Sequence, residues 1–284
     1  MTGVLWAGGP VGPVAECVLA PNPGPMTLDG TNTWILAAPD QRQAVVVDPG
    51  PDDEGHLAAV VRAAERRDLR IVAVLLTHGH ADHSAGAPRL RDLTGAPVRA
   101  LDPRHVLGSE GLTGGTLLEI AGLTIEVVAT PGHTGDCLSF VVAERGLLLT
   151  GDTVLGRGTT VVAHPDGRLA PYLESLRDLE RLAVEHDLSA LLPGHGPVLA
   201  TPAAPPADVV RAYLQHRRER LDQVRAAVAA GARTARDVVE RVYADVPREV
   251  WPAAELSVRA QLVHLDDLAR AGAPGPDAAA GHGQ

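Results

Sequence analysis

The feature that most constrains this chain is a run of three histidines and an aspartate that follows a short apolar segment. The segment Ile71–Leu76 contains only aliphatic residues and has the length of a buried strand. Directly after it comes Thr77-His78-Gly79-His80-Ala81-Asp82-His83. Imidazoles crowded beside an apolar strand are costly unless a cation draws them together. The run therefore predicts a metal site at the end of this strand.

The spacing inside the run divides its donors between two positions. On an extended loop, His78 and His80 point the same way, while Asp82 and His83 face a second position. Gly79 lets the backbone come close to the site. The run therefore presents donors toward two positions.

Three more polar residues follow segments that we predict to be strands. They are His133 after Thr124–Val128, Asp152 after Leu147–Leu149, and His195 after Leu191-Leu192. In an open α/β sheet, functional sites collect at strand ends. Seven nitrogen and oxygen donors on one rim predict a site for two Zn²⁺ ions, with Mn²⁺ or Fe²⁺ as alternatives.

The chain reads as a mixed α/β domain followed by helices. Short apolar runs predict strands and a leucine and valine spacing of three to four predicts helices, which together indicate layered α/β structure over residues 1–200. The predicted strands are Ala44–Val47, Ile71–Leu76, Thr124–Val128, Leu138–Val142 and Leu147–Leu149, and the predicted helices are Glu54–Arg67 and Tyr172–Glu185. The proline-rich segment 201–207 predicts a linker.

Residues 208–271 are predicted to form a small helical domain. Helical patterns cover Ala207–Ala230, Arg233–Tyr243 and Ala253–Arg270. The second of these begins with Thr234 as N-cap and has Asp237 three residues on. Residues 272–284 are rich in Gly, Ala and Pro, so we expect them to be disordered.

Composition excludes several chemistries and locations. All 25 basic residues are arginine, which rules out a Schiff-base lysine and a phosphate-binding Walker A lysine. The net charge of −10 argues against bulk attraction to nucleic acid or anionic membranes. Two cysteines are too few for a disulfide scaffold, no signal peptide is apparent, and no apolar run could cross a bilayer. We therefore expect a cytoplasmic protein without membrane association.

The charge is unevenly distributed along the chain. Residues 1–206 contain 14 arginines and 24 acidic residues, whereas residues 207–271 contain 11 arginines and 10 acidic residues. The second part holds a small cluster formed by Arg217, Arg218 and Arg220. Such a cluster is usually a solvated helix face, and contact with nucleic acid is the alternative.

The order His78-x-His80-x-Asp82-His83, then His133, Asp152 and His195, resembles the metallo-β-lactamase-fold hydrolase superfamily. The resemblance covers about residues 14–200 and implies a four-layer αββα sandwich. By this resemblance the first metal would bind His78, His80 and His133, the second would bind Asp82, His83 and His195, and Asp152 would bridge both.

Asp48 is a further residue that fits the resemblance to this superfamily. It stands in Val46-Val47-Asp48-Pro49-Gly50 and resembles the buried aspartate that members of the superfamily hold beside the site. The alternative is an ordinary turn residue at the end of a strand.

A narrower resemblance concerns the β-lactamase-like-protein-2 group. It rests on three segments, Thr31-Asn32-Thr33-Trp34, Gly151-Asp152-Thr153-Val154-Leu155-Gly156 and Pro193-Gly194-His195-Gly196-Pro197-Val198. That group includes a mitochondrial single-strand endoribonuclease and carries a C-terminal winged-helix-like domain. Residues 213–220 are similar to the opening helix of that domain, so the resemblance extends to about residue 271.

The resemblance implies a dinuclear-metal hydrolase in which a hydroxide that bridges the metals attacks a carbonyl or phosphoryl centre. Asp82 is expected to act as the catalytic residue, both as a ligand and as the group that orients the hydroxide. His164 is a candidate for contact with substrate, with an ordinary loop histidine as the alternative. The remaining histidines, His216 among them, show no ligand spacing and are given no role.

The expected substrate is either a phosphodiester of the single-stranded RNA type or a small ester or thioester. A homodimer is an open alternative to a monomer. Three other functions stay open: a glyoxalase II-like thioesterase, which the absence of lysine disfavours; an iron-dependent sulfur dioxygenase; and a C-terminal nucleic-acid- or partner-binding module with a vestigial catalytic site. Zinc β-lactamases place cysteine where Asp152 stands, so antibiotic hydrolysis is not expected.

Overall fold

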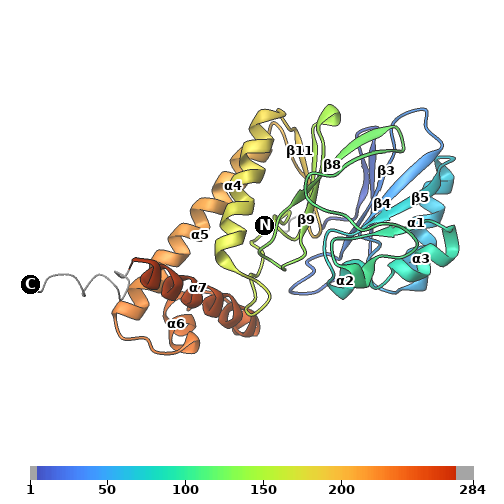
Figure 1. Cartoon of the computed structure of the whole chain (residues 1–284). Coiled ribbons are helices and arrows are strands. Elements are labelled where there is room, and N and C mark those ends of the chain that lie inside the picture. The colour runs from blue at the N-terminus through green and yellow to red at the C-terminus, as the bar shows by residue number, and fades with distance from the viewer. Residues whose placement is uncertain (1–4, 273–284) are drawn as a thin grey trace, which may run out of the picture.

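The structure, a computed structural model that describes residues 5–272, contains two facing six-stranded sheets with helices on their outer sides (Figure 1). The first sheet has the order β1 (Gly9–Val11), β2 (Ala15–Leu19), β3 (Asn32–Leu36), β4 (Gln43–Val47), β5 (Arg70–Leu75) and β6 (Val98–Arg99). The second has the order β12 (Leu199–Ala200), β11 (Ala190–Pro193), β10 (Leu147–Gly151), β9 (Leu138–Val142), β8 (Leu123–Ala129) and β7 (Leu117–Ile120).

The main core lies between the two sheets. Trp34 and Leu36 from the first sheet pack in one cluster with Ile125 and Phe140 from the second. Strand β8 alternates between buried and half-buried residues from Leu123 to Val128, as a strand does when one face meets another sheet. The aromatic residues are few, so aliphatic side chains supply most of this layer.

Helices complete the outer layers and give the predicted αββα sandwich. Helices α1 (Glu54–Arg66) and α3 (Ala87–Thr94) cover the first sheet, and α4 (Leu169–Glu185) and α5 (Pro206–Ala229) cover the second. Helix α1 begins where the Asp53 side chain accepts a hydrogen bond from the backbone N–H of His56. Its buried face includes Leu57, Val60 and Ala64, which follow the helical spacing seen in the sequence.

Two parallel strand pairs bring functional loops to one edge. Strands β4 and β5 run parallel, as do β10 and β11, so the loops after these strands leave from neighbouring carboxyl ends. The structure contains all five predicted strands, with bounds that differ by no more than two residues. Strands β6 and β12 have only two residues each, too short for a periodic signal.

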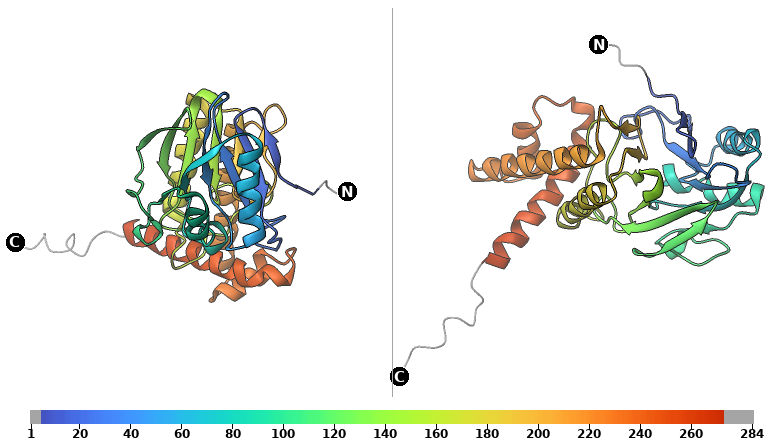
Figure 2. Two further views of the ribbon diagram at one scale, coloured as in Figure 1. Left: turned by 90° about the vertical axis from the view of Figure 1, so that its right-hand side faces the viewer. Right: turned by 90° about the horizontal axis from the view of Figure 1, so that it is seen from above.

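The C-terminal helices are attached to the sandwich rather than standing apart from it (Figure 2). Helix α5 packs along α4, and its far end forms a second small core with α6 (Ala235–Val242) and α7 (Trp251–Gly272). Thr234 and Asp237 form the expected capping box at the start of α6. A turn over residues 201–204 precedes α5.

Two expectations concern the ends and the surroundings of the chain. The expected disorder of residues 272–284 falls, apart from Gly272 at the end of α7, outside the described residues. Within residues 5–272, none of the helices combines the length and the apolar character needed to cross a membrane.

Candidate metal centre

The predicted ligands lie together where the loops after β5, β8, β10 and β11 converge. His78, His80, Asp82 and His83 occupy the loop after β5 and the short helix α2 (Ala81–Ser84). His133, Asp152 and His195 approach from loops that follow strands of the second sheet. Together these side chains form three overlapping groups, and within each group the ligand atoms lie within 4.8 Å of one another.

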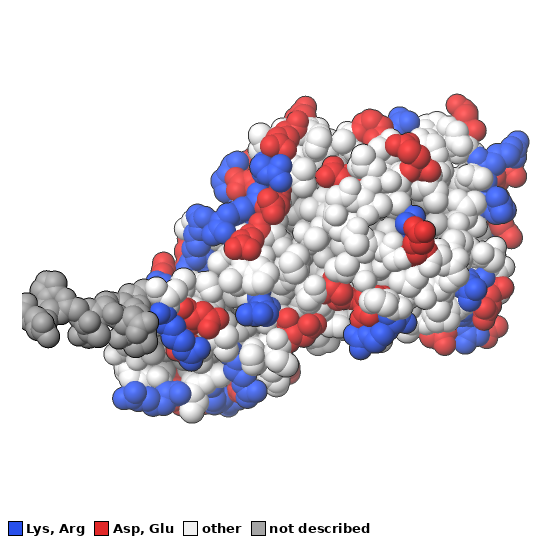
Figure 3. All heavy atoms as spheres, in the orientation of Figure 1, with Lys and Arg blue, Asp and Glu red and all other residues white. Residues whose placement is uncertain are grey.

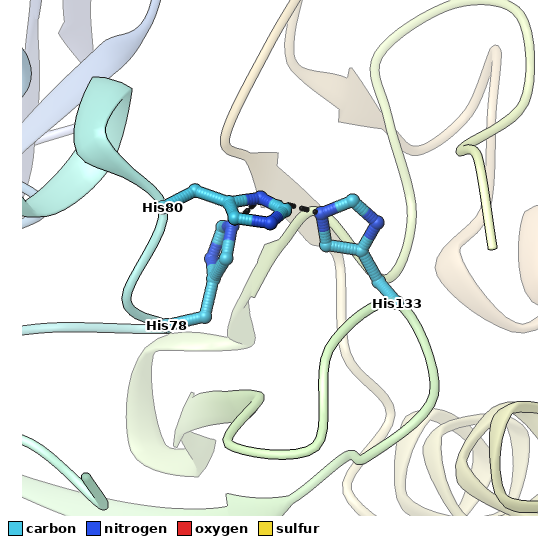
Figure 4. A group of neighbouring side chains, drawn as sticks. All are labelled: His78, His80 and His133. Atoms are coloured by element: carbon cyan, nitrogen blue, oxygen red, sulfur yellow. Dashed lines mark hydrogen bonds between the residues drawn. The ribbon is translucent and has the colours of Figure 1, made fainter. Parts of the chain in front are cut away.

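The first group consists of His78, His80 and His133, whose rings point toward one another (Figure 4). The Nδ1 atom of His80 lies 3.1 Å from His78 Nε2 and 3.1 Å from His133 Nε2. His78 is fully buried and His80 is exposed, so the group opens to solvent on the side of His80.

The second group consists of Asp82, His83 and His195. The Nε2 atoms of His83 and His195 lie 3.2 Å apart, and Asp82 Oδ2 lies 3.3 Å from His195 Nε2 and 3.6 Å from His83 Nε2. The division into two groups is the one expected from the spacing of the run after β5.

Asp152 lies between the two groups. Its carboxylate oxygens are 3.3 Å from His195 Nε2, 3.5 Å from His83 Nε2 and 3.7 Å from His133 Nε2. Its Oδ1 atom is buried and has no hydrogen-bond partner among the described residues. The carboxylate is therefore placed to serve both groups at once.

Hydrogen bonds behind the rings fix which nitrogen faces the centre. His83 Nδ1 donates to Asp48 Oδ2 at 2.9 Å, His133 Nδ1 donates to Val161 O at 2.7 Å, and His195 Nδ1 donates to Gly30 O at 3.2 Å. Because carboxylate and carbonyl oxygens only accept, each Nδ1 carries a proton. Each Nε2 therefore turns toward the centre with a free lone pair when the ring is neutral.

Asp48 organises the base of the site. Its carboxylate also accepts from the backbone N–H of Thr77 at 2.8 Å and from Thr77 Oγ1 at 2.7 Å. Since that hydroxyl donates to Asp48, it accepts from His78 Nδ1 at 3.0 Å. Asp48 is buried and has a φ of 52°, so it is at once the aspartate beside the site and a strained turn residue.

The arrangement fits bound metal ions. Neutral imidazole nitrogens 3.1–3.2 Å apart with facing lone pairs repel one another unless a cation lies between them. The unpartnered Asp152 oxygen needs the same compensation. Histidine nitrogens and carboxylate oxygens are donors that zinc prefers, and first-row metals in general accept them. The described residues thus form a cluster able to bind metal ions.

Titration of the cluster reflects the same crowding. Burial alone would raise the pKa of Asp152, but His195 and His83 hold it well below its usual value. Burial would lower the pKa of His195, and the carboxylates of Asp152 and Asp82 instead raise it to about 9. Burial, together with the neighbouring imidazoles, lowers the pKa of His78 well below 6.5. Metal ions and protons therefore compete for the same inward-facing atoms.

Gly194 leaves the space that this crowding needs. A Cβ atom at this position would lie 2.5 Å from Asp152 Oδ1 and 2.7 Å from His83 Cε1. The backbone here passes directly against two ligands, so only glycine fits.

His164 does not join the ligand cluster. It lines a separate pocket formed by the loop before α4 and by α7, where its neighbours are Arg168, His264 and Asp267. The expectation that it contacts substrate stays a prediction. Asn32, which the sequence offered only as part of a motif, ties β3 to the loop that carries His195, because its Nδ2 donates to Pro193 O and Gly196 O.

A cavity of about 390 Å³ opens directly beside His133 and Asp152. Most of its wall is apolar. The apolar lining residues come from three segments of the chain and are Met26, Leu28, Leu155, Val161, Tyr243, Val246, Val250, Ala253 and Ala254. Helices α5 and α7 and the segment after α6 contribute a large part of this wall. No local signal in the sequence predicts this cavity, because its wall is assembled from distant segments.

The interpretation of the arginine cluster as a solvated helix face is wrong for Arg217. Arg217 is buried at 7% exposure and Arg220 is half-buried, and both line the cavity, whereas Arg218 is exposed. Positions 217 and 220 lie three residues apart on one helix face, and this face lines the cavity. His216, given no role from the sequence, also lines the cavity.

Comparison with protein families matches the metallo-beta-lactamase superfamily over residues 26–195 and a beta-lactamase associated winged helix domain over residues 234–272. The chain belongs to the metallo-beta-lactamase superfamily. It is a metallo-beta-lactamase-like hydrolase, as the resemblance of the ligand pattern implied. It carries a C-terminal winged-helix domain, as the narrower resemblance to the β-lactamase-like-protein-2 group implied.

Several known proteins are similar to this chain over most of their length. The lactamase-like protein aptB of Emericella nidulans is 32% identical, over 83% of this chain and 75% of the relative. An atrochrysone carboxyl ACP thioesterase of Aspergillus fumigatus is 32% identical, over 82% and 74%. A beta-lactamase-like protein 2 homolog of Caenorhabditis elegans is 31% identical, over 87% and 82%.

Solved structures share the whole fold. A metallo-beta-lactamase family protein of Thermus thermophilus superposes with a TM-score of 0.73 at 22% identity, covering 93% of this chain and 97% of the other. A beta-lactamase domain protein of Burkholderia ambifaria gives a TM-score of 0.74 at 22% identity, covering 94% and 91%. These similarities include the C-terminal helices as well as the sandwich.

Proposed function

We propose that this enzyme is a dinuclear-metal thioesterase that hydrolyses a thioester with a largely apolar acyl group. The observation that carries the proposal is the apolar cavity that opens directly onto His133 and Asp152. A cavity of this kind takes up an apolar acyl chain and leaves the scissile carbonyl beside the ligand cluster.

The ligand cluster would supply the chemistry. Zinc ions are the cofactor that we propose, held by His78, His80 and His133 on one side, by Asp82, His83 and His195 on the other, and by Asp152 between them. When bound, two such ions supply a Lewis acid and a nucleophile at neutral pH without a serine or cysteine.

Asp82 has the position of a residue that orients the attacking water. Its side chain is 30% exposed, against 10% for Asp152, so it is the ligand carboxylate that faces solvent. Burial would raise its pKa, but the hydrogen bond from His195 lowers it, so Asp82 stays ionised and can accept a proton from water at Oδ2.

The relatives support the thioester over other substrates. One relative is named as an atrochrysone carboxyl ACP thioesterase, and the similarity extends over most of both chains. Burial also raises the pKa of Cys137 to about 12, so this nearby thiol is not the nucleophile. Both cysteines are free and buried, which suits the cytoplasmic location that we propose.

Cleavage of single-stranded RNA is the second candidate, favoured by arginines in the cavity wall and by similarity to a beta-lactamase-like protein 2 homolog. The surface counts against it. On the face shown in Figure 3, the basic side chains over the C-terminal helices lie in separate patches, some beside acidic side chains, and form no continuous basic strip. Phosphate contacts along such a strip supply most of the affinity for RNA.

An assay panel on zinc- and manganese-loaded enzyme tests the proposal. We expect hydrolysis of medium-chain acyl thioesters at rates at least about tenfold above those for a chromogenic phosphodiester or single-stranded RNA, because the apolar wall of the cavity binds an apolar acyl chain. The matched control is Asp82→Ala, which should lose turnover while its circular dichroism spectrum stays unchanged. RNA cleavage without thioester hydrolysis would overturn the proposal in favour of the second candidate.

A further inference from the structure

The cavity beside the metal centre carries an unbalanced positive charge. Among the described residues that line it, Arg157, Arg217 and Arg220 are cationic, and the one carboxylate is that of Asp152, which belongs to the ligand cluster. Arg157 is neutralised by an ion pair with Asp29. The imbalance stands out in a chain whose net charge is −10.

Arg217 is the most unusual of these residues. Its side chain is buried, and within residues 5–272 no Asp or Glu forms an ion pair with it. One guanidinium nitrogen donates to Thr160 O and the group lies 5.1 Å from the centroid of the Tyr172 ring, but Nε is buried without a partner. A buried guanidinium without a carboxylate is costly, and a ligand anion would offset that cost.

Arg220 and His216, which lie next to Arg217 in the cavity wall, also lack compensating partners among the described residues. Arg220 donates to Val242 O at 2.7 Å and lies 4.3 Å from the centroid of the Tyr243 ring, and no described carboxylate pairs with it. His216 Nδ1 is buried without a hydrogen-bond partner. Two guanidinium groups and an imidazole thus converge on one wall of the cavity with hydrogen-bonding capacity left over.

We propose that Arg217, assisted by Arg220, binds an anionic group of the substrate, a carboxylate or a phosphate, while the apolar wall holds the acyl part. The preferred substrate is then an anionic thioester rather than a neutral one. This inference rests on the proposed function, and it names the substrate class of the same site.

A purely structural role for Arg217 makes a different prediction. Thr160 O, which accepts from Arg217, adjoins Val161 O, which accepts from the metal ligand His133. If Arg217 only held this loop, its loss would misplace His133. The metal content of the protein would then fall, and kcat would fall equally for every substrate, charged or neutral.

Three thioesters separate these roles and the two sources of charge. They are octanoyl-N-acetylcysteamine, which is neutral; the same compound with a terminal carboxylate on the acyl chain; and octanoyl-4′-phosphopantetheine, which carries a phosphate on the thiol side. The variants are R217M and, as matched control, R218M, which removes an exposed arginine from the adjacent position of α5.

For R217M we expect KM to rise about 10- to 100-fold for the substrate whose anion Arg217 binds, since a charge-assisted hydrogen bond contributes about 1.5–3 kcal/mol. KM for the neutral thioester should change less than about twofold, and R218M should behave as wild type on all three. Arg217→Lys should show a smaller rise in KM than R217M, because it keeps the positive charge. Arg220 is half-buried, so Arg220→Met should raise KM for the same anionic substrate by a smaller factor.

Direct binding keeps the inference separate from the proposed function. Octanedioic acid monoamide, neutral octanamide and 4′-phosphopantetheine are titrated calorimetrically into wild type, R217M, R220M and R218M. If wild type hydrolyses no thioester but R217M or R220M selectively loses an anionic probe, the proposed function fails and the anion site stands. If all variants bind the anionic probes as wild type does, or lose charged and neutral substrates equally, the inference is overturned.

Discussion

The metal cluster and the cavity beside it share His133 and Asp152 but are built in opposite ways. In the cluster, Asp48, Val161 and Gly30 hold His83, His133 and His195 from behind. In the cavity, polar atoms of His216 and Arg217 are buried without partners, and most of the remaining wall is apolar. The histidines of the cluster are therefore held in place without a substrate. In the cavity wall, by contrast, polar atoms remain without hydrogen-bond partners among the described residues.

The difference separates reaction from selectivity. Ligands of the cluster lie at strand ends inside the sandwich, while much of the cavity wall belongs to α5, α7 and the segment after α6. Changes in the cluster should therefore abolish turnover of every substrate. Changes in the cavity should alter which substrate is used and leave metal binding intact.

The largest effect is expected from the residue that joins both metal groups. Asp152→Ala should lower kcat/KM by about 10³-fold or more, because metal ions supply several kcal/mol of transition-state stabilisation. It should also reduce metal content more than Asp82→Ala, because Asp152 contacts histidines of both groups whereas Asp82 belongs to one. Elemental analysis and kinetics check both. The control Asp178→Ala removes an exposed carboxylate of α4, and equal metal content in all three variants would contradict a bridging Asp152.

A smaller effect is expected one hydrogen bond away from the metals. Asp48→Ala should weaken metal affinity about 10- to 100-fold, because His83 loses the acceptor that orients it. The free energy of unfolding should fall by about 1–3 kcal/mol, since the buried N–H of Thr77 loses its partner. Chelator competition and urea unfolding measure the two quantities.

The matched control for this change is Asp52→Ala, which removes an exposed carboxylate paired with Arg89. Its effect on stability should stay within about 0.5 kcal/mol. A response as large as that of Asp48→Ala would show that the loop after β4, rather than the hydrogen bonds of Asp48, organises the cluster.

A larger side chain in the cavity wall should change substrate selectivity without changing metal binding. Ala254 lies in the cavity wall on α7, so Ala254→Phe should reduce kcat/KM for an octanoyl thioester by about tenfold and spare an acetyl thioester. Ala226→Phe, at an exposed position of α5, is the control. Reduced metal content in Ala254→Phe would contradict the separation of the two regions.

The smallest effect concerns the loop that carries His133. Burial raises the pKa of Cys137 to about 12, so almost no thiolate exists at pH 8 and reactivity should appear only as the pH approaches that value. Cys137 Sγ lies 3.0 Å from Thr134 Oγ1 in this loop. We expect no alkylation of native enzyme by iodoacetamide at pH 8, read by mass spectrometry. Rapid labelling of Cys137 at that pH would show that the loop opens.

Much of the metal centre could be predicted because its ligands carry local signals. The run from His78 to His83 follows an apolar strand, and Asp152 and His195 each follow another. Strands that run parallel bring such positions to one edge, so their assembly follows from the fold class. The capping box at Thr234 was predictable for the same reason, since both partners lie within one turn.

The sequence by itself therefore determined the sandwich and the cluster of histidine and aspartate side chains at its edge, because short-range patterns and strand order suffice for them. Only the tertiary structure decided the cavity and the burial of Arg217. Residues near 26, 157, 217 and 254 meet there because α5 packs along α4 and α7 returns toward the sandwich. Burial depends on segments that are distant in the chain, and an arginine on a helix has no local sign of what will cover it.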